Sequence, residues 1–206
     1  MMESKVIGAI MVDVDGVLVH GRPTKGGPWA SDMEADLGVK RTDLQREFFT
    51  PHWDDIVTGR RGLDERLRPA LARIAPDLSP EQFIAYWFEN DARLDLQLLA
   101  DLGHQRRRGT KVYLATNQEH LRASFLIEQL GLGQHCDGIY YSAALACRKP
   151  DIEFYEKIAS LSGLTPDQLH LIDDTHANVL AAKKLGWNAV EWTTGSTLAA
   201  ALTTLE

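Results

Sequence analysis

The sequence predicts a doubly wound α/β fold, in which a mostly parallel five-stranded sheet carries an inserted helical segment. Five short apolar segments rich in β-forming residues recur along the 206-residue chain, and each has the length of a buried strand. Helical patterns separate the last four segments, which favours right-handed crossovers and a parallel sheet covered on both faces. Nearly 100 residues separate the first segment from the second. That stretch is too long for one crossover, so it forms an insertion.

The predicted strands and helices have clear ends. The strands are 6–12, 111–115, 138–141, 169–172 and 188–192. The helices are 119–130, 152–161 and 177–185. Each helix is followed within two residues by a glycine, which favours the left-handed conformation at a helix C-terminus.

The insertion has helical patterns of its own. One repeats an apolar residue every four positions from Leu63 to Leu71. Another follows Ser79-Pro80-Glu81-Gln82, which combines an N-cap serine, a first-turn proline and a capping-box glutamine. The predicted domains are an α/β core of residues 1–19 and 106–206 and a helical cap of residues 20–105.

The composition is that of a globular protein, with 44% apolar and 25% charged residues. The formal net charge is −7, which argues against general binding to nucleic acid or to anionic membranes, because both need a basic surface. It does not exclude an anionic substrate. A metal ion or one lysine can supply positive charge locally.

The two cysteines, Cys136 and Cys147, do not stand in the spacing of a zinc or redox site. A reduced, cytoplasmic setting is the simplest interpretation. The apolar stretch near the N-terminus runs into Asp13 and Asp15, unlike the core of a signal peptide. No segment approaches the roughly 20 apolar residues that span a membrane. We therefore expect neither export nor membrane insertion.

Two carboxylates, Asp13 and Asp15, follow the first apolar segment and precede Gly16. The carboxyl ends of strands in open α/β sheets bind ligands. A carboxylate pair there can divide its labour, because one group attacks an electrophile while the other donates a proton to the leaving oxygen. An ordinary Asp-Gly turn after a strand is the alternative.

Polar residues also follow the second, third and fourth strands. They are Thr116 and Asn117, then Lys149 before Pro150, then Asp173 and Asp174. Singly, each has an ordinary interpretation as a helix cap or a surface lysine in a turn. Capping predicts no match among successive strand ends, whereas a phosphoryl-transfer site predicts all of them. Four converging carboxylates need a cation, and Mg²⁺ suits oxygen ligands and phosphate.

Four motifs, in order along the chain, resemble those of the haloacid dehalogenase superfamily. They are Asp13-Val14-Asp15-Gly16-Val17, Thr116-Asn117, Arg148-Lys149-Pro150 and Ile172-Asp173-Asp174. The stretch from Cys147 to Trp192 is especially similar to sugar-phosphate phosphatases and to the phosphatase domain of soluble epoxide hydrolase, which carry a helical C1-type cap after the first motif. The resemblance implies a Rossmann-like core and magnesium-dependent hydrolysis of a small phosphorylated metabolite, a sugar-phosphate-like monoester. We expect a monomer or a homodimer.

The resemblance also implies roles for single residues. Asp13 would be the nucleophile that forms an aspartyl-phosphate, and Asp15 the general acid and then the general base. Thr116 and Lys149 would stabilise charge on the phosphate, and Asn117 would help to bind it.

The resemblance also implies a set of magnesium ligands. These are Asp13, the backbone carbonyl of Asp15, and the acids of the fourth motif. Of those acids, Asp174 is expected to be the direct ligand and Asp173 to support it. Asn178 resembles a position that supports this loop, and an ordinary helical surface residue is the alternative.

Three other functions stay open. A phosphosugar mutase shares the first motif, and Gly59-Arg60-Arg61-Gly62 in the cap could hold a second phosphate. A haloacid dehalogenase resembles the chain less, because it lacks an acid at the Asp15 position. A non-catalytic module fits poorly, since no key side chain is missing. The candidates for substrate recognition are His20, Arg22, His52, Trp53, Arg60 and Arg61.

Overall fold

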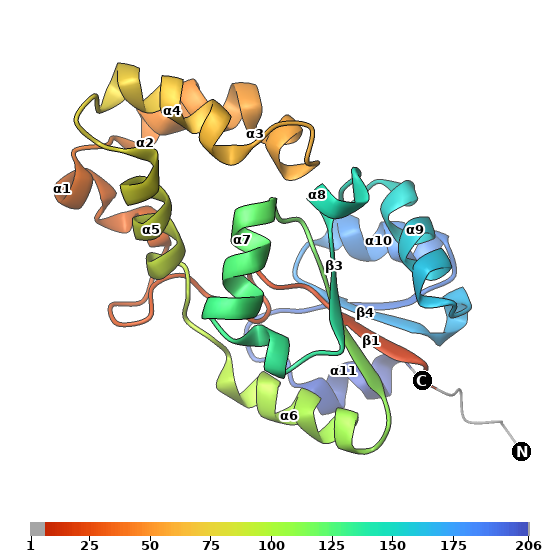
Figure 1. Cartoon of the computed structure of the whole chain (residues 1–206). Helices are drawn as coiled ribbons and strands as arrows, with labels where there is room; N and C mark the ends of the chain where they lie inside the picture. Colours follow the sequence, from red (N-terminus) through yellow and green to blue (C-terminus); the bar gives the residue numbers. More distant parts are fainter. Residues whose placement is uncertain (1–6, 206) are drawn as a thin grey trace, which may run out of the picture.

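The computed structural model describes residues 7–205, so the predicted strand start at residue 6 lies outside the described residues. Its centre is a parallel five-stranded sheet in the order β3-β2-β1-β4-β5 (Figure 1). The strands are β1 (Ala9–Val12), β2 (Lys111–Thr116), β3 (Gly138–Tyr141), β4 (Leu169–Asp173) and β5 (Asn188–Glu191). The first strand lies in the middle and the chain winds away from it in both directions, which confirms the predicted fold class.

The helices form two groups along the chain. The insertion contains η1 (Trp29–Ser31), α1 (Met33–Leu37), α2 (Arg41–Leu44), the π-helical η2 (Gln45–Phe49), α3 (Thr50–Val57), α4 (Leu63–Ile74) and α5 (Pro80–Asn90). The rest are α6 (Leu96–Arg107), α7 (His120–Ser124), the π-helical η3 (Phe125–Gln129), η4 (Leu132–Gln134), α8 (Ser142–Leu145), α9 (Ile152–Ser162), η5 (Pro166–Gln168), α10 (His176–Lys184) and α11 (Leu198–Leu205). Among the described residues, no helix is both long and apolar enough to cross a membrane.

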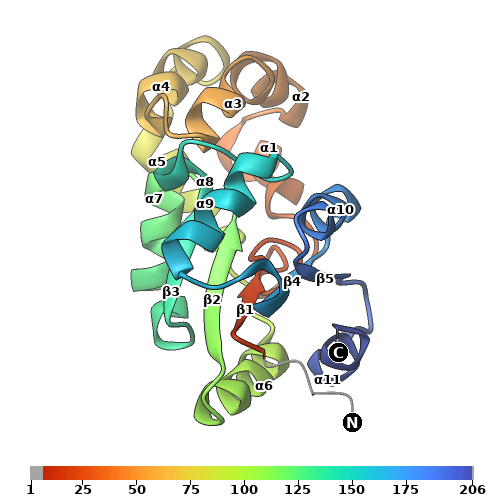
Figure 2. The ribbon, with the colours of Figure 1, turned by 90° about the vertical axis from the view of Figure 1, so that its right-hand side faces the viewer.

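Helices cover both faces of the sheet, as a parallel sheet requires. Ile10 and Val12 of β1 share one core with Leu98 of α6. Met11 lies in a second core with Phe154 of α9. The views in Figures 1 and 2 place α6 and α11 together on one side of the sheet and α9 and α10 on the other. Successive side chains of β1 therefore pack alternately into two separate cores.

The predicted helix signals have their expected local geometry. Gly131, Gly163 and Gly186 follow helices with positive φ angles of 83°, 69° and 83°, a conformation that glycine adopts without a Cβ clash. Ser79 Oγ accepts a hydrogen bond from the Gln82 backbone N–H at 3.2 Å, and Gln82 Oε1 accepts one from the Ser79 N–H at 3.0 Å. The capping box predicted for α5 is confirmed.

The insertion forms a helical unit with its own core, above the sheet in Figures 1 and 2. Met33, Phe48 and Phe83 are fully buried there. The Trp29 and Trp87 rings stack with centroids 5.3 Å apart. Aromatic side chains thus supply much of this core, since each of them buries a large apolar area.

Helix α6 packs with the sheet and not with the cap. Leu98, Leu99 and Leu102 are buried in the core that contains β1. Two linkers join the cap to this core, and they lie side by side: His20 N–H donates to Arg93 O at 2.9 Å. The predicted domain division stays a prediction, and this packing favours a boundary before Leu96 over one at residue 105.

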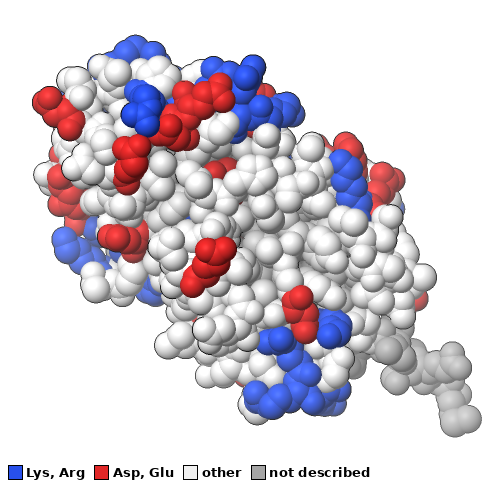
Figure 3. All heavy atoms as spheres, viewed as in Figure 1, with Lys and Arg blue, Asp and Glu red and all other residues white. Residues whose placement is uncertain are grey.

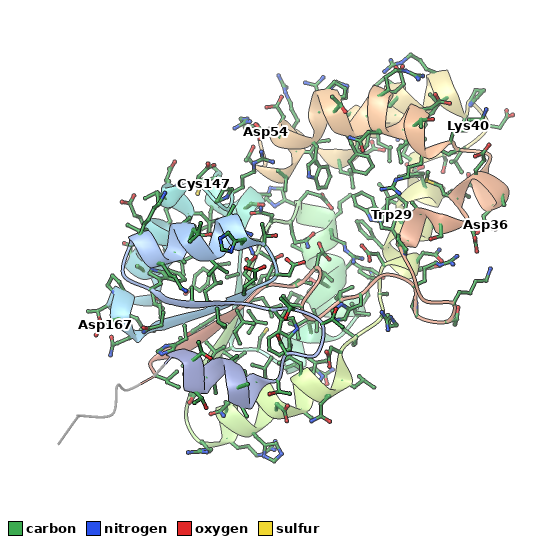
Figure 4. All side chains as sticks on the ribbon, turned by 180° about the vertical axis from the view of Figure 1, so that it is seen from behind. Trp29, Asp36, Lys40, Asp54, Cys147 and Asp167 are labelled. Atoms are coloured by element: carbon green, nitrogen blue, oxygen red, sulfur yellow. The ribbon has the colours of Figure 1, made fainter. Side chains whose placement is uncertain are left out.

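The cap also contacts the core at a distance from the linkers. Ser142 Oγ of α8 donates to Val57 O at the end of α3, at 2.6 Å. Arg148 Nε lies 3.2 Å from Asp54 Oδ1. Figure 4 shows Asp54 at the cap end that approaches the segment carrying Cys147, while Asp36 and Lys40 lie at the far end of the cap. The cap therefore contacts the core through α3 as well as beside its linkers.

Candidate active site

The sequence-predicted residues gather at one edge of the sheet. Asp13 follows β1, Thr116 ends β2, Asp173 ends β4, and Asp174 comes next. They come together because the carboxyl ends of parallel strands lie at the same edge. Of the seven predicted side chains, four are buried, Asn117 is half-buried, and Asp15 and Asp174 are exposed. The buried four are Asp13, Thr116, Lys149 and Asp173.

Lys149 links the acids of two strands. Its ammonium Nζ lies 2.9 Å from Asp13 Oδ1 and 2.6 Å from Asp173 Oδ2, and it donates to Ala115 O at 2.9 Å. The Lys149 side chain is buried, with an exposed fraction of 1%. A buried ammonium is tolerated only with such partners. Lys149 therefore holds two carboxylates close together that would otherwise repel each other.

The backbone of Lys149 is held by Asn117. Asn117 Oδ1 accepts from the Lys149 N–H at 2.8 Å, and Asn117 Nδ2 donates to Lys149 O at 3.0 Å. We predicted that Asn117 binds phosphate, and that prediction is not tested by these bonds. These two hydrogen bonds show that the Asn117 amide also holds the backbone of Lys149 in position at the edge of the sheet.

Burial raises the pKa of Asp13 to about 7, although the nearby Lys149 ammonium opposes this shift. The pKa of Lys149 is also raised. Burial alone would lower it, but Asp13 and Asp173 outweigh burial because they stabilise the ammonium. The lysine therefore stays charged, while the Asp13 carboxylate needs further positive charge to stay ionised at neutral pH.

The two acids of the fourth motif differ in their surroundings. Asp173 is fully buried, and its carboxylate accepts bonds from the Thr175 N–H at 2.9 Å and from Asn178 Nδ2 at 2.9 and 3.1 Å. Asp174 is exposed and accepts from Thr175 Oγ1 at 3.2 Å. Asn178 therefore supports this loop from a buried position on α10. The interpretation as a plain surface residue is wrong.

Asp13, Asp173 and Asp174 can together hold a metal ion. One carboxylate oxygen from each lies within 4.8 Å of the others. Gly16 makes room for this cluster, because a Cβ built on it would stand 2.0 Å from Asp174 Oδ2. An all-oxygen set of this kind suits Mg²⁺.

Sequence reasoning missed two partners of Asp15. Gln118 Nε2 donates to Asp15 Oδ2 at 2.7 Å. On its other side, Arg122 Nη2 lies 3.9 Å from Asp15 Oδ1. Both partners are buried, with exposed fractions of 3% and 2%. A charged residue on the inner face of a predicted helix was the signal that could have drawn attention to Arg122.

The family model described as haloacid dehalogenase-like hydrolase matches residues 7–186, and so contains all these residues. The chain belongs to this family. As a hydrolase of this family it is similar to a sesquiterpene phosphatase of Aspergillus oryzae, 26% identical over 86% of each chain. It is also similar to a D-ribitol-5-phosphate phosphatase of Bacteroides thetaiotaomicron, 24% identical over 91% of this chain and 95% of that protein.

Solved structures share the fold of this hydrolase. One is a haloacid dehalogenase family enzyme of Bacteroides thetaiotaomicron in complex with magnesium and inorganic phosphate. Its TM-score is 0.78, with 17% identity over 94% of this chain and 98% of that one. The L-2-haloacid dehalogenase of Xanthobacter autotrophicus has a TM-score of 0.62, with 20% identity over 94% and 80%. At these identities the likeness concerns the fold.

The candidate recognition residues lie in different settings in the hydrolase. Arg22 is paired with Asp32, and Arg60 with Asp54 and Asp55. Arg61 Nη1 lies 3.7 Å from Glu65 Oε1. His52 is half-buried on α3. Trp53 packs against Trp87, with ring centroids 5.8 Å apart, in the aromatic cluster of the cap.

His20 lines a cavity beside the acidic cluster of Asp13, Asp173 and Asp174. The cavity has a volume of about 600 Å³ and reaches Gly16 and Asp174. Arg93, Asp95 and residues 192–196 form the rest of its wall. Among the six candidates, His20 therefore shares a cavity wall with the site acid Asp174.

Proposed function

We propose that this hydrolase is a magnesium-dependent phosphatase that cleaves a small phosphorylated metabolite, a sugar-phosphate-like monoester, through an aspartyl-phosphate. One observation carries the proposal: the buried carboxylate of Asp13 lies 2.9 Å from the Lys149 ammonium and inside the acidic cluster. Similar proteins named as phosphatases, and a similar structure that binds magnesium and phosphate, support it.

Magnesium would be held by Asp13, by the Asp15 backbone carbonyl and by Asp174. Asp173 already accepts bonds from three groups of the protein, so we assign it the role of holding Lys149 and the loop in place. The bound ion would supply positive charge to the phosphoryl oxygens and to Asp13. The pKa of Asp13, which burial raises to about 7, supports a role for that charge in keeping the carboxylate ionised.

In the first step an oxygen of Asp13 attacks phosphorus, and the bond from phosphorus to the ester oxygen breaks. Asp15 gives its proton to the departing oxygen, which leaves as an alcohol. Lys149 and the Thr116 hydroxyl stabilise the negative charge on the phosphoryl group. Gln118 holds Asp15 in place through its bond to Oδ2.

In the second step Asp15, now ionised, takes a proton from water. The water oxygen attacks phosphorus, and the bond from phosphorus to Asp13 breaks. Inorganic phosphate leaves and the Asp13 carboxylate is restored. The mutase alternative gains no support from the cap. Arg60, the candidate for holding a second phosphate, is instead paired with two acids of the cap.

The test begins with p-nitrophenyl phosphate and a screen of phosphorylated metabolites in the presence of magnesium. We expect phosphate release and an acid-stable, base-labile phosphoenzyme. Asp13→Asn should form no phosphoenzyme and show no turnover, because an amide is a poor nucleophile. Full activity after exhaustive chelation, or a phosphoenzyme in Asp13→Asn, would contradict the proposal.

A further inference from the structure

Arg122 is a buried cation outside the acidic cluster, and its partners come from three parts of the chain. It lies on α7 of the core. Its guanidinium donates to Phe88 O at 3.2 Å and to Asp91 O, and its Nη2 lies 3.6 Å from Asp91 Oδ2. The same nitrogen lies 3.9 Å from Asp15 Oδ1. Burying a guanidinium is costly, so each of these partners matters to its position.

Two aromatic rings lie against this guanidinium. Its central carbon lies 5.2 Å from the centroid of Phe88 and 5.3 Å from that of Phe125. The two rings also touch each other, with centroids 5.3 Å apart. Phe88 belongs to the cap and Phe125 to the core, so the rings close around the cation only while the two units are in contact.

The cap residues that Arg122 contacts lie where the chain passes from the cap back to the core. Phe88 lies in the last turn of α5, and Asp91 begins the linker that returns to the core. Just after it, Ala92 N–H donates to Gly21 O of the outgoing linker at 3.0 Å. A movement of the cap about its linkers would therefore change the backbone of the segment that Arg122 holds, from Phe88 to Asp91.

We propose that Arg122 is a positioning residue that ties the cap's return linker to Asp15. The proton donor is then aimed at the site only when the end of α5 is seated on α7. This inference rests on the proposed function, because it takes Asp15 as the general acid. Arg122 is not placed on the substrate; it acts through Asp15 and the linker.

The test compares two aryl phosphates of similar shape in single-turnover, rapid-quench phosphorylation. Phenyl phosphate has a leaving group about as basic as a tyrosine side chain, whereas p-nitrophenyl phosphate leaves without much help. In Arg122→Lys the charge remains, but one ammonium cannot reach all the partners of a guanidinium. We expect phosphorylation by phenyl phosphate to slow at least about tenfold more than phosphorylation by p-nitrophenyl phosphate, a part of the full contribution of a general acid.

Arg106→Lys is the matched control. Arg106 also bridges a carboxylate and a carbonyl, namely those of Asp137 and Gln134. Arg106 lies in the last turn of α6. Figure 3 shows basic side chains gathered over this helix, away from the cap. We expect the ratio of the two rates to stay at the wild-type value. Should Arg122→Lys unfold, Phe125→Leu removes one ring from the guanidinium and should shift the ratio in the same direction.

An unchanged ratio in a folded Arg122 or Phe125 variant would overturn the positioning role, since a purely structural residue would slow both substrates alike. Hydrogen exchange of the amides of residues 88–95 is the readout that needs no activity. It should quicken in Arg122→Lys and not in Arg106→Lys. If the wild type forms no phosphoenzyme, the proposed function fails. The link between Arg122 and the linker is tested separately, because unchanged hydrogen exchange in Arg122→Lys would overturn it.

Discussion

At the scale of single residues, the two adjacent acids at the end of β4 have different roles. Asp173 is fully buried and pairs with Lys149, while Asp174 is exposed beside Gly16. Asp174→Ala should abolish magnesium binding with little change in stability, because a solvated carboxylate is removed. Asp173→Ala should lower the free energy of unfolding by about 3 to 5 kcal/mol, because it leaves a buried ammonium without one of its partners.

Calorimetric magnesium titrations and urea denaturation of both variants check this pair of predictions. Thr175→Ala is a useful control, because it removes the hydroxyl that donates to Asp174 and keeps both acids. Equal losses of magnesium affinity in the two aspartate variants, or the larger loss in Asp173→Ala, would reverse the assigned order of ligands.

The raised pKa of Asp13 predicts a pH-dependent stability of the metal-free protein. Burial raises this pKa from 3.8 to about 7 in the folded state, so the folded protein keeps a proton that the unfolded chain has released. The stabilisation from this group is present below about pH 4 and is lost as the pH rises through about 7. Asp13→Asn, compared with the wild type, should gain about 2 to 3 kcal/mol between pH 5 and pH 8.

Urea denaturation in the presence of a chelator measures this difference. A constant difference between wild type and Asp13→Asn across that range would show that Asp13 is ionised at pH 5. With magnesium added, the pH dependence should weaken, because the cation favours the ionised carboxylate. For the same reason, the affinity for magnesium should fall as the pH drops below about 7.

At the scale of elements, the contact of α3 with α8 is expected to hold the cap in place. The turn after α3 contains Gly59, whose φ is 72° and whose Cβ, if added, would stand 2.4 Å from Ala143 O of α8. Gly59→Ala should therefore push the cap away from the core and lower kcat/KM for p-nitrophenyl phosphate about tenfold.

Gly38→Ala is the matched control for that prediction. Gly38 has nearly the same φ, 70°, and meets nothing within 4 Å. Both variants carry the backbone strain of an alanine at positive φ, which costs about 1 kcal/mol. If kcat/KM falls equally in both variants, strain in the cap explains the loss and the contact with α8 does not matter for activity.

At the scale of the whole molecule, the cap is predicted to close the site to water and to select the substrate. The two linkers lie close enough to be joined after the cap is deleted, since the Ala92 N–H donates to Gly21 O at 3.0 Å. In the deletion variant, residues 23–90 are replaced by a short glycine linker. The deletion stops before α6, because Leu98 and Leu102 belong to the core. We expect lower efficiency and broader specificity among sugar phosphates.

The folded state of the deletion variant is checked first by circular dichroism and by its affinity for magnesium, since the acidic cluster is untouched. The unmodified chain, assayed with the same panel of sugar phosphates, gives the reference selectivity. A folded variant that keeps this selectivity would show that the recognition residues lie in the core, and His20 would then be the first to replace.

Much of the fold and site could be predicted from strand ends alone. The side chains that follow β1, β2 and β4 had to meet, because parallel strands bring their carboxyl ends to one edge. Asn178 and α6 were harder to place. Asn178 sits on a helix with little apolar patterning, and α6 continues the insertion along the chain while its leucines pack on β1. The period and spacing of apolar residues along a helix do not reveal which neighbouring element buries its apolar face.

The sequence by itself determined the strand pattern, the helix ends and the candidate acids, because each follows from local chain chemistry and from the periodicity of strands and helices. Only the tertiary structure decided how Asp15 is held. Its partners Gln118 and Arg122 are distant in sequence, and Arg122 also depends on the end of α5 in the cap. Contacts between the cap and the core depend on how their surfaces pack, and no local pattern encodes that.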